Sequence, residues 1–299
     1  MGCSDTVQRT PHQASWNAPM FAQCIRVVLF IVIPGVLAID KAQAEDGPSC
    51  DGRAEAIVRH AYPDATKSSG ETFQFRGSTI QINDGETSGD TPHTMKCRVW
   101  PANPQLTLVA VPLIKSTNED GTVGDLDLLV IDTASSAVKH RLLLADRMND
   151  DAISISAVEF DTARYRLTQD QTAFGLRIST SGSSRPNPYD GAGLWLYVIE
   201  DGSLRPVLDG LVVSQNGGEW DTNCAGEFQS SGSTLSMSAN RTNGYADITL
   251  VETKSTKTSF VEKDNECKDK TVTSKPQTLR LVYDGERYPI PEDRRALSE

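Results

Sequence analysis

Short apolar runs separated by turn-forming residues fill most of this chain, and they decide its fold class. From residue 72 onward the runs alternate apolar with polar side chains or stay apolar for a short stretch, and Gly, Asn, Asp, Ser or Pro stands in most gaps. Many short strands without intervening helices favour a sandwich, a barrel or a propeller over a parallel α/β sheet. We therefore predict an all-β fold, an antiparallel multi-stranded meander that is either propeller-like or a sandwich. The predicted strands cover residues 72–75, 79–82, 95–100, 106–113, 126–131, 138–144, 153–160, 165–167, 173–179, 194–199, 204–213, 234–238, 246–251, 259–262 and 278–283.

A strand–turn–strand pattern recurs along the chain. Residues 125–132 followed by 138–144 match residues 193–200 followed by 204–208, and weaker copies begin at residues 245 and 279. In each copy an apolar strand ends in an acidic turn and returns as a second strand. A β-propeller blade contains such hairpins, and so does any antiparallel meander, so both architectures stay open.

The N-terminal region predicts a secretory signal peptide over residues 1–44. An apolar run of about fifteen residues, with a basic residue near its start, leads to the small-residue triplet Ala42-Gln43-Ala44. The run is shorter than the roughly twenty residues that cross a bilayer, so we expect cleavage near Ala44 and no transmembrane anchor in the mature chain. Met20 is an alternative start to Met1. The predicted location is periplasmic or secreted.

Beyond the predicted leader, one segment has the spacing of a short helix. Asp51 can cap its first turn, Pro63 ends it, and apolar residues recur between them at three- and four-residue intervals. These residues are Ala54, Ile57, Val58 and Ala61. We divide the mature chain into an N-terminal helix-plus-hairpin segment, 45–104, and a main all-β domain, 105–299.

The cysteines predict two disulfide bonds. Four of the six cysteines lie beyond the predicted leader, and an even number in an oxidising compartment favours a disulfide framework. Proximity in the sequence favours the pairs Cys50–Cys97 and Cys224–Cys267. A metal site is the alternative, but no C-x-x-C motif or paired histidine accompanies these thiols.

An acidic stretch around Gly121 is the candidate cation site. Its oxygen ligands would be Asn118, Asp120, Asp125 and Asp127, and Ca²⁺ binds six to eight such oxygens. The stretch resembles an FG-GAP or VCBS type of propeller repeat, in which an acidic Gly-containing loop leads into a Leu-rich strand. That resemblance implies a propeller blade and calcium as a cofactor. The strict D-x-D-x-D-G order is absent, so we expect a solvated turn, with calcium binding as the alternative.

Two acids flank Trp220 close to a predicted disulfide. Glu219 and Asp221 would share one face of a strand, with their carboxyls within roughly 7 Å of each other. Paired carboxylates can perform acid–base catalysis, as in glycosidases. Tryptophan beside a disulfide is also a common packing arrangement, and we expect that structural role here.

A long Pro- and Gly-rich loop over residues 179–191 is the candidate partner-facing surface. Its prolines stiffen the segment, and stiff loops lose less entropy on binding. Arg185 adds a cation to an acidic molecule, and arginine and tyrosine are frequent interface anchors. We predict Arg185, Asn187 and Tyr189 as binding residues, with a plain connecting loop as the alternative.

These observations together favour binding over catalysis. The chain lacks G-x-S-x-G, P-loop, H-E-x-x-H and dinucleotide fingerprints. Its net charge of −11 argues against nucleic acid and anionic lipid as partners, because both need a basic surface. We predict a secreted periplasmic binding protein whose partner is a protein or an envelope polymer. The alternatives are an envelope-polymer hydrolase that uses Glu219 and Asp221, and a calcium-stabilised scaffold.

Overall fold

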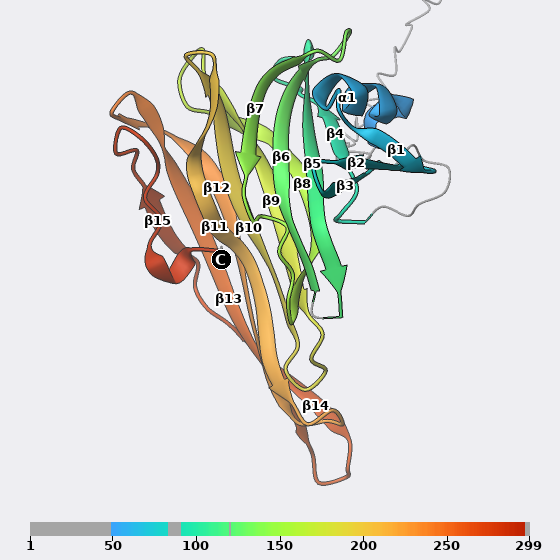
Figure 1. Cartoon of the computed structure of the whole chain (residues 1–299). Coiled ribbons are helices and arrows are strands. Elements are labelled where there is room, and N and C mark those ends of the chain that lie inside the picture. The colour runs from blue at the N-terminus through green and yellow to red at the C-terminus, as the bar shows by residue number, and fades with distance from the viewer. Residues whose placement is uncertain (1–48, 83–90, 120, 297–299) are drawn as a thin grey trace, which may run out of the picture. The chain divides into compact units, whose positions relative to one another are not determined.

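The computed structural model describes residues 49–82, 91–119 and 121–296, which lie within one compact unit, Asp46–Glu299. They form one α-helix and fifteen strands in two antiparallel sheets (Figure 1), which confirms the predicted all-β fold with a short helix. The predicted signal peptide lies outside the described residues. Among the residues that are described, no helix is long and apolar enough to cross a membrane.

The first sheet contains seven strands in the order β1-β2-β3-β5-β6-β7, with β4 paired to β5. They are β1 (Thr66–Ser69), β2 (Thr72–Phe75), β3 (Ser78–Gln81), β4 (Lys96–Val99), β5 (Leu106–Asn118), β6 (Gly121–Asp132) and β7 (Val138–Leu144). Pro112 lies inside β5, between Ala110, which pairs with β4, and Ile114, which pairs with β3. Its missing N–H therefore faces a gap in the ladder, where a strand tolerates proline.

The second sheet contains eight strands in the order β14-β13-β12-β11-β10-β9-β8, with β15 paired to β13. They are β8 (Ile153–Arg166), β9 (Thr172–Gly182), β10 (Tyr189–Glu200), β11 (Ser203–Trp220), β12 (Gly226–Thr242), β13 (Tyr245–Val261), β14 (Cys267–Thr273) and β15 (Gln277–Leu281). Strands β12 and β13 run far beyond their predicted bounds, and β14 and the short β1 had no apolar signal at all. Their extra residues are mostly polar, and backbone pairing with neighbouring strands holds them in the sheet.

Helix α1 (Ala54–Ala61) occupies the predicted helical segment and packs its apolar face on the first sheet. Asp51 does not cap it, which corrects the prediction, because Arg53 stands at the N-cap without a side-chain hydrogen bond. Asp51 lies instead in the turn η1 (Ser49–Gly52) with left-handed backbone, φ 49° and ψ 43°. A capping residue needs extended backbone, so Asp51 cannot fill that role.

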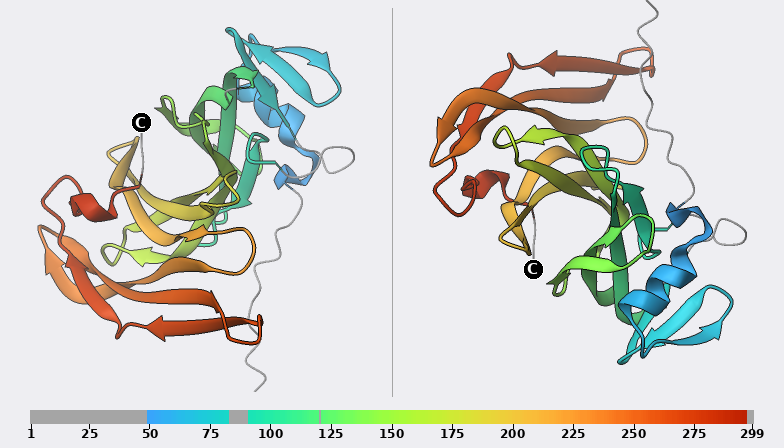
Figure 2. Two further views of the ribbon diagram at one scale, coloured as in Figure 1. Left: turned by 90° about the horizontal axis from the view of Figure 1, so that it is seen from below. Right: turned by 90° about the horizontal axis from the view of Figure 1, so that it is seen from above.

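Strand β6 is buried on both faces and places the first sheet between α1 and the second sheet. Leu129 and Ile131 pack with the apolar residues of α1, whereas Leu128 and Val130 pack in the core shared with the second sheet. Figure 2 shows α1 and the second sheet on opposite sides of the first sheet. The uninterrupted apolar run at 126–131 thus reflects burial from two sides. Two packed sheets correspond to the sandwich alternative.

The two strongest copies of the recurring strand–turn–strand pattern each begin with the most buried strand of a sheet. They are the hairpins β6–β7 and β10–β11, which lie in different sheets. Strand β10, like β6, has buried side chains on both faces, with Leu196 in one core and Trp195 in another. The division at residue 104 falls within the first sheet, because β4 precedes it and pairs with β5 beyond it.

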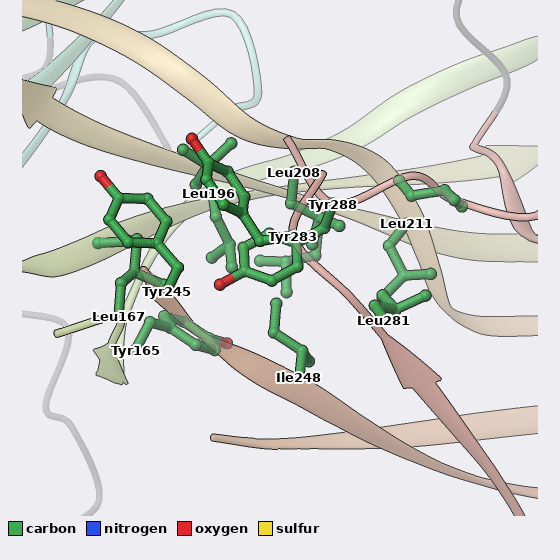
Figure 3. Close-up of a cluster of buried hydrophobic side chains, with 14 of the residues drawn as sticks. Tyr165, Leu167, Leu196, Leu208, Leu211, Tyr245, Ile248, Leu281, Tyr283 and Tyr288 are labelled. Atoms are coloured by element: carbon green, nitrogen blue, oxygen red, sulfur yellow. The ribbon is translucent and has the colours of Figure 1, made fainter. Parts of the chain in front are cut away.

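A third core fills the space between the two halves of the second sheet. Strands β11 and β12 pair only over 214–220 and 226–232, so their other halves separate. Side chains of β10, β11, β13, β15 and the C-terminal segment pack between them (Figure 3). Tyr283 lies at its centre, with ring centroids 4.4 Å from Tyr245 and 5.3 Å from Tyr288. Beyond this core, the paired ends of β11 to β14 extend as a polar sheet with two accessible faces.

Four pairs of a carboxylate with an arginine link neighbouring strands, and three of these carboxylates also accept a tyrosine hydroxyl. The pairs are Asp127–Arg141 with Tyr62, Asp161–Arg177 with Tyr165, Glu200–Arg205 with Tyr245, and Asp247–Arg280. A carboxylate removed from water needs such partners, so these pairs let acidic residues occupy positions beside the cores.

Acidification should lower the stability of the fold, and Glu200 shows the reason. Hydrogen bonds from Tyr245 at 2.7 Å and from Arg205 hold the pKa of Glu200 below its ordinary value of 4.5. A carboxylate whose pKa is lowered in the folded state stabilises the fold above its unfolded pKa and loses that contribution as the pH falls through the folded pKa. We expect the free energy of unfolding in urea to decline below about pH 4.5. Glu200→Gln should make the decline shallower, and an equally steep decline would contradict this role.

Both predicted disulfides are confirmed. Cys50 bonds to Cys97 and Cys224 bonds to Cys267, with Cα–Cα separations of 4.8 Å and 5.7 Å. The first bond ties the turn η1 to β4, and the second ties the β11–β12 turn to β14. Disulfides persist in oxidising compartments, so the pair fits a non-cytoplasmic protein.

Candidate binding site

The two segments that the sequence singled out separately, the 179–191 loop and the stretch around Trp220, lie side by side. The connection between β9 and β10 is residues 183–188, shorter than predicted, because residues 179–182 pair as part of β9 and residues 189–191 as part of β10. It runs along the end of β11. The backbone N–H of Trp220 donates to the carbonyl of Pro186 at 2.8 Å, and that of Gly218 donates to Pro188 at 3.2 Å. These bonds continue the β10–β11 ladder into the loop and bring Arg185 over Trp220.

A shallow pocket of 510 Å³ opens where this loop meets β11, β12, β13 and β14. We call it the Trp220 pocket; its lining is Arg185, Pro188, Trp220, Asn223, Cys224, Phe228, Lys257, Ser259, Cys267 and Asp269. Two half-buried aromatic rings stand in it, each with a cation above it. The Arg185 Cζ lies 5.6 Å from the Trp220 ring centroid, and the Lys257 Nζ lies 5.2 Å from that of Phe228. The pocket therefore combines apolar rings with charged groups, as ligand sites commonly do.

Two glycines make room for the aromatic rings. Trp220 pairs with Gly226 and Gly218 pairs with Phe228 across the β11–β12 ladder. A Cβ on Gly218 would lie 2.7 Å from the Phe228 ring, and one on Gly226 would lie 3.1 Å from both rings. Each Cβ would also meet a cross-strand carbonyl, that of Glu227 at 2.6 Å from Gly218 and that of Glu219 at 2.8 Å from Gly226, so both positions favour glycine.

The disulfide and a tight turn hold the rim of the pocket. Asp221 follows β11, and its Oδ1 accepts the backbone N–H groups of Asn223 at 2.9 Å and Cys224 at 2.8 Å. The Asn223 N–H is the main cause of the lowered pKa of Asp221. Asp221 therefore stabilises the turn that presents Cys224 to Cys267.

Removing the Cys224–Cys267 bond should loosen β14. All seven residues of β14 are exposed, so its attachment rests on backbone pairing with β13, on side-chain bonds to Asp269 and on this disulfide. In the double variant Cys224→Ala and Cys267→Ala we expect faster amide hydrogen exchange in β14, with unchanged exchange in β10. Unchanged protection of β14 would show that its pairing with β13 holds the strand without the disulfide.

The charges in the pocket leave one cation unmatched. Asp269 accepts hydrogen bonds from Ser259 at 2.6 Å and from Lys257 at 3.2 Å, and these partners, Ser259 foremost, lower its pKa. Arg185 is exposed and, within the described part of the chain, has no hydrogen bond or ion pair. The pocket thus carries two cations and one anion on a chain whose net charge is −11.

Tyr189, a second predicted binding residue, lies on the opposite face of this sheet. It pairs with Gly217, whose neighbours Gln215 and Glu219 alternate away from Trp220. The Tyr189 ring lies over Gly191 on this face, because a Cβ on Gly191 would be 2.9 Å from the Tyr189 hydroxyl. Arg185 and Tyr189 therefore do not form one surface. Asn187, the third predicted residue, is exposed, and its backbone N–H donates to Ser184.

Glu219 and Asp221, the candidate catalytic pair, differ in their surroundings. Glu219 lines a polar groove of 640 Å³ on the face opposite Trp220, while the Asp221 carboxylate is bonded into its turn. The cross-strand partner of Glu219 is Glu227, and the groove is also lined by Lys254. Both glutamates are exposed. The sequence does not show how β11 pairs with β12, so it could not predict Glu227 as the cross-strand partner of Glu219.

The candidate calcium ligands that the structure describes each take part in a separate interaction. Asp125 forms an ion pair with Lys115 at 2.7 Å, and Asp127 is buried against Tyr62 and Arg141. Asn118 accepts the backbone N–H of Gly121, and Asp120 lies outside the described residues. Within the described ranges, no group of three or more His, Cys, Asp or Glu side chains is placed to hold a metal ion.

Three pocket residues, Phe228, Lys257 and Asp269, were missed by sequence reasoning. Phe228 and Lys257 lie in the polar ends of β12 and β13, and Asp269 lies in the exposed strand β14, where apolar residues do not alternate. The predicted Cys224–Cys267 bond was the available signal, because it brings the residues that follow each cysteine close to Trp220.

Comparison with protein-family models, with curated proteins and with solved structures finds no match for this chain.

Proposed function

We propose that the protein is a secreted envelope binding protein and that its ligand occupies the Trp220 pocket. The observation that carries the proposal is the convergence of Arg185, Trp220, Phe228 and Lys257 from four separate segments on one depression. Half-buried rings beside charged groups bind an apolar surface and fix its orientation at the same time. The supporting disulfide keeps the arrangement in place without a ligand, which lowers the entropy lost on binding.

Binding is favoured over hydrolysis because of where the carboxylates lie. A glycosidase buries its general acid in apolar surroundings, so that the carboxyl keeps its proton near neutral pH. Glu219 and Glu227 stand in an open polar groove, and Asp221 accepts hydrogen bonds from its own turn. Asp269, the carboxylate of the Trp220 pocket, is bonded to Lys257 and Ser259.

The test measures how accessible the Trp220 ring is to oxidation. The protein is incubated with a muramidase digest of Gram-negative sacculi or with soluble periplasmic extract, and hydroxyl-radical oxidation is quantified by mass spectrometry. We expect slower oxidation of Trp220 than in buffer, because a ligand in the pocket covers the ring. Tyr189, on the opposite face, should oxidise at the same rate with and without extract and so serves as the internal control.

Two variants separate the pocket from the rest of this sheet. Phe228→Ala removes one wall of the pocket and should abolish the protection of Trp220. Lys254→Gln changes a lysine on the opposite groove and should leave the protection intact. Unchanged oxidation of Trp220 in both preparations would refute the proposed function.

A further inference from the structure

We propose that the Trp220 pocket binds a saccharide that carries a carboxylate, such as a uronic acid unit of an acidic glycan. The inference rests on the proposed binding function and names the ligand class. It is drawn from the charge of the pocket, the position of Arg185 and the two half-buried rings.

Arg185 is the group that selects an acidic ligand. Its guanidinium lies over Trp220 and, among the described residues, has neither an ion pair nor a hydrogen bond. A guanidinium binds a carboxylate through two parallel hydrogen bonds, and contact with an aromatic ring orients this fork before the ligand arrives. Lys257 is already paired with Asp269, so Arg185 is the cation with open donors.

The rings select the sugar. One face of a pyranose presents C–H groups with small positive partial charges, which suit the negative face of an aromatic ring. Trp220 and Phe228 are half-buried on neighbouring strands and line the pocket, and a sugar would contact the parts of the rings that Arg185 and Lys257 leave exposed. The exposed side chains of Asn223 and Asp269 lie at its rim, where they can bond to sugar hydroxyls.

The same geometry argues against a cationic ligand. Here Arg185 and Lys257 already lie over the two rings, at 5.6 Å and 5.2 Å from their centroids. A bound ammonium group would meet positive charge at both rings.

The test compares three ligands by isothermal titration calorimetry with the full chain as it is secreted. Trigalacturonic acid has both the rings and the carboxylates, maltotriose has neutral rings, and triglutamate has carboxylates without sugar rings. We expect trigalacturonic acid to bind at least about tenfold more tightly than either comparison ligand. Arg185→Gln should weaken the binding of trigalacturonic acid by about tenfold or more. Arg185→Lys should weaken it less than Arg185→Gln does, because lysine keeps the charge but lacks the forked pair of donors.

Lys254→Gln is the matched control, since it removes a cation from the opposite face of the same strands and should leave the affinity unchanged. Equal binding of maltotriose would overturn the carboxylate requirement while leaving the pocket as a sugar site. Equal binding of triglutamate would overturn the saccharide. Absence of binding by all three would overturn the inference, whereas the proposed function would then still be judged by the Trp220 oxidation experiment.

Discussion

Replacing Asp127 by alanine should lower the free energy of unfolding by about 3 kcal/mol. Asp127 is 1% exposed and accepts hydrogen bonds from the Tyr62 hydroxyl at 2.7 Å and from the Arg141 guanidinium. Without the carboxylate, the buried Tyr62 hydroxyl has no acceptor, and a cavity opens between α1 and the first sheet. The value lies at the lower end for a broken buried ion pair, because Arg141 is 41% exposed and can turn to water.

Asp125→Ala is the matched control, because Asp125 lies on the same face of β6, two residues away. Its partner Lys115 is 45% exposed, so we expect a loss of no more than about 1 kcal/mol. Tyr62→Phe, which removes only the hydroxyl, should fall between the two. Urea unfolding followed by circular dichroism gives all three values. Equal losses for Asp127→Ala and Asp125→Ala would show that burial does not decide the effect.

The double variant Cys50→Ala and Cys97→Ala should lose about 4 kcal/mol of unfolding free energy, because the bond restricts the unfolded chain over a long loop. The two cysteines are 47 residues apart, and Cys50 is buried in the core between α1 and the first sheet. The bond also anchors the chain just before α1, so its removal should free the helix to leave the sheet. Urea unfolding of the oxidised protein and of the variant measures the difference.

The Cys224–Cys267 bond offers the comparison. It spans 43 residues, so the chain-entropy contribution is nearly equal, but it anchors only the exposed strand β14. A smaller loss for Cys224→Ala and Cys267→Ala would mean that β14 separates from the sheet while the rest stays folded. A loss below about 1 kcal/mol for the Cys50–Cys97 pair would contradict a role for that bond in global stability.

Sequence patterns predicted the buried strands well and the polar strands poorly. The apolar run of β6 and the alternation of β7 follow directly from burial on two faces and on one face. Strand β14 has no buried residue, and its seven residues are in the sheet because they pair with the backbone of β13. The local sequence of a strand does not indicate which distant strand will pair with it.

The candidate site shows the same division. Arg185, Glu219 and Asp221 were singled out from two separate segments, and the structure puts Arg185 over Trp220 while it turns Glu219 to the opposite face. Phe228 joined the site because β12 pairs with β11. Strand alternation predicts which residues share a face within one strand, but the register between strands decides which faces meet.

The sequence by itself determined the all-β class, the helix at residues 54–61 and both disulfide pairs, because apolar spacing and cysteine proximity can be read directly from the chain. Tertiary structure alone decided that the loop of Arg185, the ring of Phe228 and the Lys257–Asp269 pair meet around Trp220. Their convergence depends on the successive pairing of β11, β12, β13 and β14 and on the Cys224–Cys267 bond. Pairing between strands that are distant in the sequence depends on the backbone hydrogen bonds and the buried cores of the whole sheet. A short stretch of sequence does not contain that information.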